Sequence, residues 1–211
     1  MKNQRAIELI FDFKGSSLKD RFAEIKSKTI GKTKYQIPIR NELFNAALTI
    51  KKASAQINEI VHAVGILNAL DKILDSDEKV EDLSLAARSE GDGFDLVTDR
   101  RLAEFKFSRW QVGSVKNDMR KRHSFADFAK LTISRTEKKK ELYVVSANQV
   151  TKYFNGGAKW RKVLSKSGGI QDELGKYLSD KSRGDIKTLR EVFEISTVQI
   201  FDLDDILNIT E

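Results

Sequence analysis

Residues 93–107 read GFDLVTDRRLAEFKF, two runs of alternating apolar and polar residues on either side of a polar tetrapeptide. Such alternation is typical of β-strands, and a short polar connection between two such runs is typical of a hairpin. We expect strands over Phe94–Thr98 and Arg101–Phe107, with Asp99 and Arg100 as a two-residue turn. This hairpin decides the fold, because the segments before and after it are predicted to form the helices and strands that pack around it.

The turn sets two acidic residues of the hairpin opposite each other. With this register Asp95 faces Glu104, and their β-carbons would lie about 4.5–5.5 Å apart on one face. Like charges at that distance destabilise a sheet unless a cation offsets them. Lys106 lies on the same face, which we expect to form a site. The opposite face is predicted to be buried by Phe94, Leu96, Ala103, Phe105 and Phe107.

This pair of carboxylates predicts a metal site. Hard oxygen ligands favour Mg²⁺ or Mn²⁺ over zinc, and Mg²⁺ typically takes one or two protein carboxylates, with water and substrate phosphate completing its shell. A phosphate substrate is therefore expected. Glu90 and Asp92 lie just upstream, and a bulge in the hairpin would put Asp92 in the place of Asp95.

The segments around the hairpin indicate an α/β protein with extra N-terminal helices. Before it we expect a helix from Ser16 or Ser17 to about Lys28, a second from about Arg40, and a central helix over Ser54–Leu74, apolar on both sides, in which His62 is an ordinary helix residue. The later predictions are a strand at 83–88, a helix at 112–131, a strand at 142–145, a helix ended by Gly156-Gly157, a stretch ended by Gly168-Gly169, a strand at 197–201 and a helix from Asp202.

The positive charge is concentrated in one third of the chain. Residues 100–166 carry 18 Lys and Arg against 5 Asp and Glu, whereas residues 1–99 carry 15 against 16 and residues 167–211 carry 5 against 10. Trp110, Tyr153 and Trp160 are interspersed in the basic third. This combination favours contacts with the phosphates and bases of nucleic acid, DNA or RNA, and the alternative is a solvated lysine-rich surface.

Composition excludes several classes of protein. With no Cys among 211 residues, the chain has no disulfide framework, thiolate zinc site or cysteine nucleophile. No apolar run approaches the ~20 residues that cross a bilayer, and the N-terminus lacks the features of a secretory signal, so we expect a cytoplasmic protein with no membrane partner. The length fits a single domain, with residues 1–50 as a helical extension, 54–166 as the core and 167–211 as a C-terminal extension.

An acidic residue followed after eight residues by Glu-x-Lys, here Asp95, Glu104 and Lys106, resembles the signature of the PD-(D/E)XK, or restriction-endonuclease-like, nuclease superfamily. The resemblance covers the hairpin and its flanks. Phe94 stands where the superfamily name has Pro, at a position that varies among members. The resemblance implies a core in which a helix, a mixed sheet with the hairpin at its centre and a second helix follow one another.

The same resemblance implies roles for individual residues. Asp95 and Glu104 would bind the metal together with the carbonyl of Phe105, and Lys106 would position and activate the attacking water. Glu59 would add a carboxylate from the preceding helix. The products would carry a 5′-phosphate and a 3′-hydroxyl.

We therefore expect a metal-dependent DNA endonuclease of the restriction and defence type or of the recombination and repair type. Cutting both strands would call for a homodimer or for two successive nicks. Arg109 is a candidate clamp for the scissile phosphate, and Lys116, Arg120 and Lys121 are candidates for contacts with the nucleic-acid backbone. The alternatives are a non-catalytic nucleic-acid-binding protein of the same fold and a nuclease subunit that needs a partner.

Overall fold

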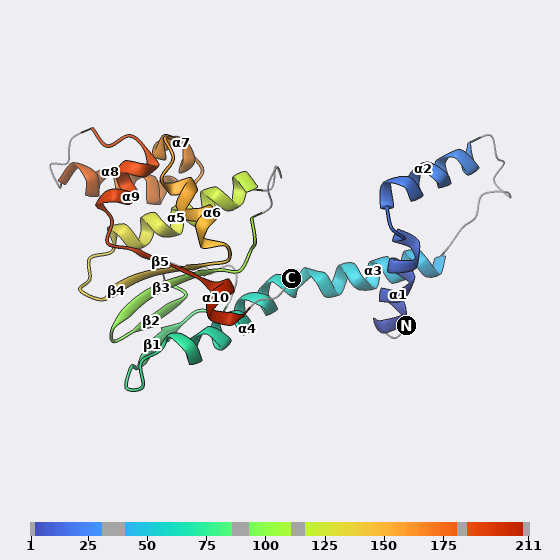
Figure 1. The fold of residues 1–211 in the computed structure, drawn as a ribbon, viewed down its shortest axis with the longest axis horizontal. Coiled ribbons are helices and arrows are strands. Elements are labelled where there is room, and N and C mark those ends of the chain that lie inside the picture. The colour runs from blue at the N-terminus through green and yellow to red at the C-terminus, as the bar shows by residue number, and fades with distance from the viewer. Residues whose placement is uncertain (1–2, 31–40, 86–92, 111–116, 181–184, 209–211) are drawn as a thin grey trace. The chain divides into compact units, whose positions relative to one another are not determined.

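The computed structural model describes residues 3–30, 41–85, 93–110, 117–180 and 185–208. Its contacts divide the chain into two compact units, Met1–Asn58 and Glu59–Glu211 (Figure 1). The boundary falls inside the helix predicted over Ser54–Leu74. The predicted C-terminal extension belongs to the same unit as the hairpin. None of the described helices is long and apolar enough to cross a membrane.

The first unit is helical, as the sequence predicts. It contains α1 (Asn3–Lys14), α2 (Leu18–Thr29) and α3 (Asn41–Ala55). The Ser17 side chain accepts the N–H of Asp20 at 3.3 Å, which makes it the N-cap of α2. Small buried side chains, Ala6 of α1 and Ala46 of α3, allow α1 and α3 to pack against each other.

The second unit is built on a five-stranded mixed sheet. Its strands lie in chain order, and they are β1 (Val80–Leu83), β2 (Leu96–Thr98), β3 (Arg101–Lys106), β4 (Lys139–Val144) and β5 (Gln199–Asp202). The first three strands are antiparallel, whereas β4 and β5 run parallel to β3. A parallel step needs a crossover, and a helix follows both β3 and β4 (Figure 1).

The register of the hairpin is the predicted one. Leu96 pairs with Ala103, and the turn falls at residues 99–100. Asp95 lies just before β2, and its side chain accepts the N–H of Phe105, the residue after Glu104. The local pattern of the sequence was therefore sufficient to predict the pairing.

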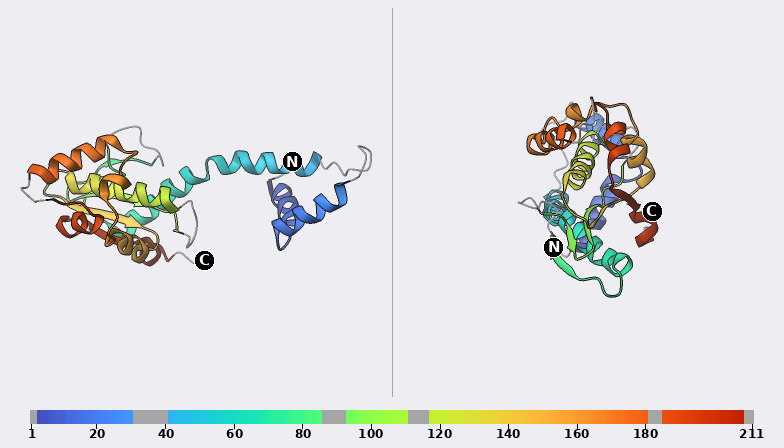
Figure 2. Two further views of the ribbon diagram at one scale, coloured as in Figure 1. Left: turned by 90° about the horizontal axis from the view of Figure 1, so that it is seen from above. Right: turned by 90° about the vertical axis from the view of Figure 1, so that its left-hand side faces the viewer.

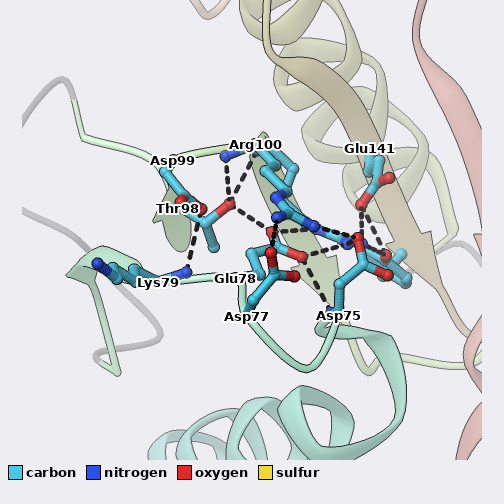
Figure 3. A network of polar contacts seen from close by, with 10 residues as sticks. Asp75, Asp77, Glu78, Lys79, Thr98, Asp99, Arg100 and Glu141 are labelled. Carbon is cyan, nitrogen blue, oxygen red and sulfur yellow. Dashed lines mark hydrogen bonds and ion pairs between the residues drawn. The ribbon is translucent and has the colours of Figure 1, made fainter.

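A network of charges fixes the turn end of the hairpin (Figure 3). The Arg101 guanidinium donates to both oxygens of Glu78 at 2.6 Å, and to Oε2 of Glu141 at 3.0 Å. The Thr98 hydroxyl donates to Glu78 at 2.5 Å. Burial would raise the pKa of Glu78, but the hydrogen bonds from Arg101 and Thr98 outweigh it and lower that pKa to about 2. The loop before β1 is thus tied to β3 and β4.

Helices cover both faces of this sheet. Figures 1 and 2 show α4 and α5 on opposite sides. Phe105 packs with Ile66 on the α4 side, while Leu102 packs with Phe128 on the α5 side. The helices of this unit are α4 (Ile57–Ile73), α5 (Asn117–Ile133), α6 (Ala147–Phe154), α7 (Trp160–Val163), α8 (Gly168–Asp180), α9 (Leu189–Ile195) and α10 (Leu203–Leu207).

The helix predicted over Ser54–Leu74 forms, but it packs differently from the prediction. The helix exists as α4, but it covers one face of the sheet instead of lying at the centre. Ile66 and Ala69 are buried, whereas Ile60, Val64 and Leu67 are about half exposed, at 52%, 48% and 48%. Its apolar residues therefore exceed what one sheet face can bury.

The strand predicted at 83–88 lies earlier in the chain. β1 covers Val80–Leu83, Ser84 and Leu85 lie outside it, and residues 86–88 fall outside the described ranges. The stretch predicted to end at Gly168-Gly169 does end there, since α7 and the turn after it stop before α8 begins at Gly168. Of the helix predicted at 112–131, α5 accounts for 117 onward, and residues 111–116 lie outside the described ranges.

Candidate active site

Glu104 and Lys106 lie at the carboxyl end of β3, on the face that α5 covers. Helices cover both faces here, because a strand with a parallel neighbour in the middle of a sheet is buried on both sides. The Glu104 side chain is only 5% exposed, whereas that of Lys106 is 30% exposed. Lys106 is therefore the more exposed member of this pair.

Asp95 is buried just before β2 begins. Its Oδ2 accepts the N–H of Phe105 at 2.8 Å, and its Oδ1 lies 3.4 Å from Nε2 of His62 on α4. Burial would raise the pKa of Asp95, but His62, Lys106 and the Phe105 N–H together lower it. Asp95 is therefore held as a carboxylate. The alternative ligand, Asp92, lies outside the described residues.

Phe94 does not follow the predicted alternation. It packs on the α5 side of the sheet, where the Lys130 ammonium lies 4.7 Å from the centre of its ring. Because β2 begins only at Leu96, the strand geometry that would put Phe94 on the same face as Leu96 does not extend that far.

Glu104 is the electrostatically strained member of the site. Its Oε1 accepts a hydrogen bond from Lys130 at 3.0 Å, and its Oε2 lies 3.9 Å from Lys106 Nζ. Burial first, and then repulsion from Asp127 and Asp95, raise the pKa of Glu104 to about 8 in spite of the two ammonium groups. At neutral pH the protein alone therefore does not fully stabilise the Glu104 carboxylate.

Lys106 is held by a residue that the sequence reasoning missed. Its Nζ lies 3.0 Å from Oδ2 of Asp127 on α5. Burial would lower the pKa of Lys106, but the carboxylates of Asp127, Glu104 and Asp95 raise it well above its ordinary value. Lys106 is therefore an ammonium throughout the neutral range, able to donate hydrogen bonds and unable to act as a base.

The α4 residue that reaches the site is His62, one turn after the predicted Glu59. His62 is buried, and its ring meets Phe107 edge-on with 5.9 Å between ring centres. The Glu59 side chain is exposed. The sequence contained a signal that His62 faces the sheet. His62 shares the i, i+4, i+7 face of α4 with Ile66 and Ala69, which are fully buried.

The predicted nucleic-acid contacts are already engaged within the protein. Arg109 forms an ion pair with Asp204 at 2.7 Å, and the Arg120 guanidinium donates to the Arg109 carbonyl at 2.6 Å. The Lys121 ammonium lies 5.4 Å from the centre of the Tyr153 ring. Lys116 lies outside the described residues.

Part of the basic segment lies away from the site. Around the amino end of β4, Lys138 donates to the carbonyl of Thr98, and Lys140 donates to carbonyls at the end of α5. Lys139 pairs with Arg101 and Val144 with Lys106, so about 16 Å of strand separates this basic cluster from Lys106. These three lysines are therefore not an extension of the site.

The residues present fit a hard divalent cation with an incomplete protein shell. Within the described ranges, no three His, Asp or Glu side chains form a ready-made metal cage. Asp95 and Glu104 supply two carboxylates, the number that Mg²⁺ commonly takes. Two buried atoms, Nε2 of His62 and Oδ2 of Asp127, have charged groups as their neighbours, Asp95 Oδ1 at 3.4 Å and Lys106 Nζ at 3.0 Å. The repulsion that raises the pKa of Glu104 is the kind that a cation relieves.

Comparisons of the chain with protein-family models, with curated proteins and with solved structures give no match. The functional argument therefore rests on the geometry of these side chains.

Proposed function

We propose that the Glu59–Glu211 unit is a metal-dependent phosphodiesterase, an endonuclease that acts on DNA. The observation that carries the proposal is the convergence of Asp95, Glu104 and Lys106 at one end of the hairpin, two carboxylates and one ammonium largely withdrawn from water. The order of helix, antiparallel strands, crossover helix and parallel strand supports a restriction-endonuclease-like core.

The side chains have separate tasks in this proposal. Asp95 and Glu104 would hold Mg²⁺ or Mn²⁺, with the Phe105 carbonyl as a further ligand, and the N–H of Phe105 keeps Asp95 in place. His62 would orient the second oxygen of Asp95. The bound ion would polarise the scissile phosphate and lower the pKa of a water molecule.

Lys106 would bind and orient the attacking water or a phosphate oxygen. Because its pKa is raised, it donates hydrogen bonds and stabilises the charge that develops on the phosphate, and the proton of the water must leave to solvent or to the substrate. Asp127 holds the ammonium in place from α5. Its role is to keep Lys106 charged and oriented.

Substrate binding would use backbone phosphates. Arg109 and Lys121 keep 38% and 34% of their side chains exposed while engaged, and further basic side chains of the same unit are exposed on α6 and α7. Contacts of this kind position a duplex without reading its sequence. Defence and repair roles, and cleavage of both strands by a homodimer or by successive nicks, are both compatible with this arrangement.

Cleavage assays with matched variants test the proposal. Supercoiled, linear and branched DNA, and RNA, are incubated with the full chain and Mg²⁺, Mn²⁺ or chelator. We expect cleavage that chelator stops and that Glu104→Ala or Lys106→Ala lowers by at least about 100-fold. Glu137→Ala and Lys139→Ala, which change exposed side chains of the same unit, are the controls and should cut normally.

Two results would replace the proposal. Binding of DNA without any product, for every substrate and metal and equally in the Glu104→Ala variant, would favour a non-catalytic binding protein. Metal binding that depends on Glu104 without cleavage by the purified chain would instead indicate a subunit that needs a partner.

A further inference from the structure

Lys130 contacts three groups that meet at the mouth of the site. Its ammonium donates to Oε1 of Glu104 at 3.0 Å and to the carbonyl of Gly93, and it lies over the ring of Phe94. Its side chain is 20% exposed. It reaches the site from α5, three residues after Asp127, so both residues project from the same side of the helix.

The two lysines of the site differ in their partners. Lys106 lies closer to Asp127, at 3.0 Å, than to Glu104, at 3.9 Å. Lys130 forms the shorter contact with Glu104 and occupies one of its two oxygens. A divalent ion bound to Glu104 would have to share that carboxylate with an ammonium group of the same sign.

We propose that Lys130 is a positioning residue that competes with the divalent cation for Glu104. It pairs with Glu104 when the cation is absent and withdraws when the cation binds. The Gly93 carbonyl and the Phe94 ring lie beside it and can retain the withdrawn ammonium. This inference rests on the proposed function, because it assumes that Glu104 is a metal ligand.

A consequence is that Lys130 weakens metal binding. Removing its charge takes away both a competitor and a source of repulsion, so affinity for the cation should rise. A purely structural lysine would have the opposite effect, since its loss would loosen α5 against β3 and disorder the ligands. The sign of the change in affinity therefore separates the two roles.

Titration calorimetry with Mn²⁺ on the full chain, without DNA, tests the inference. We expect Lys130→Met to bind Mn²⁺ about tenfold more tightly than wild type. Lys130→Arg, which keeps the charge, and Lys176→Met, which removes an exposed charge on α8, should bind as wild type does. If Lys130→Met fails to fold, Lys130→Gln removes the charge and retains a hydrogen-bond donor, with the same expected tightening.

The possible failures are distinguishable. Equal or weaker Mn²⁺ binding by a folded Lys130→Met, with wild-type binding lost in Glu104→Gln, would overturn the competition and leave the metal site standing. Absence of Mn²⁺ binding by wild type, or binding unaffected by Glu104→Gln, would overturn the metal site and the competition together.

Discussion

Replacing Glu104 by Gln should stabilise the metal-free protein while it abolishes cleavage. The Glu104 carboxyl is buried beside Asp95 and Asp127, and these surroundings raise its pKa from an ordinary value of 4.5 to about 8. The neutral amide has nearly the same shape, still accepts a hydrogen bond from Lys130, and adds no negative charge.

The size and sign of this effect follow from linkage. Below pH 4.5 the carboxyl is protonated in the folded and the unfolded chain, so the substitution should change stability little. Between pH 4.5 and about 8 only the unfolded chain ionises fully, and wild-type stability falls as pH rises. A rise of the pKa from 4.5 to about 8 corresponds to at most ~5 kcal/mol. The partly exposed Lys106 and Lys130 can move closer to the ionised Glu104 and reduce this cost. We therefore expect the Glu104→Gln variant to be more stable than wild type by ~2 kcal/mol at pH 8.5.

Urea unfolding measures this difference. Trp110 and Trp160 both lie in the Glu59–Glu211 unit, so their fluorescence reports on the unfolding of that unit. In EDTA, the Glu104→Gln variant should exceed wild type by ~2 kcal/mol at pH 8.5 and by much less at pH 5.5. Addition of Mg²⁺ should stabilise wild type at pH 8.5 and leave the variant unchanged. A variant that is no more stable than wild type at pH 8.5, or an advantage that does not shrink at pH 5.5, would refute the reasoning.

Other predictions concern the frame of the site. Glu78→Gln should lower the free energy of unfolding by ~2 kcal/mol at pH 7. This loss should disappear as pH falls from 4.5 toward 2, because the folded-state pKa of Glu78 is about 2. Urea unfolding measures the difference, with Asp77→Asn, which changes an exposed side chain, as a nearly neutral control. Gly65→Ala would put a β-carbon 2.4 Å from the Phe107 ring, so a net loss of ~1 kcal/mol is expected in spite of the better helix propensity. Because that ring also contacts His62, the Gly65→Ala variant should cleave DNA more slowly in the assay above.

The hairpin could be predicted because its signals are local. Alternation over residues 94–107 fixes which residues share a face, and the two-residue turn fixes the register, so the pairing of Leu96 with Ala103 followed from sequence alone. The predicted apolar face is confirmed for Leu96, Ala103, Phe105 and Phe107, whereas the cover over Glu104 is not a local property. Whether Glu104 lies open or covered depends on the parallel pairing with β4, a strand that begins more than 30 residues later.

The residues contributed by helices could not be predicted with equal certainty. Asp127 and Lys130 look like an ordinary surface pair of an amphipathic helix, and only the crossover of α5 over β3 brings them to Glu104 and Lys106. His62 differs, because its place on the buried face of α4 was visible in the periodicity. A histidine on the buried face of a helix that packs against paired carboxylates should therefore be considered a candidate site residue.

The two ends of β3 offer a comparison within one strand. At the amino end, a buried arginine meets carboxylates in a network that lowers the pKa of Glu78 to about 2, so the charges there stabilise one another without help. At the carboxyl end, Glu104 also has two lysines beside it, but deeper burial and then the neighbouring carboxylates of Asp127 and Asp95 raise its pKa to about 8. In the proposed function, a divalent cation bound by Asp95 and Glu104 would offset the repulsion between these two carboxylates.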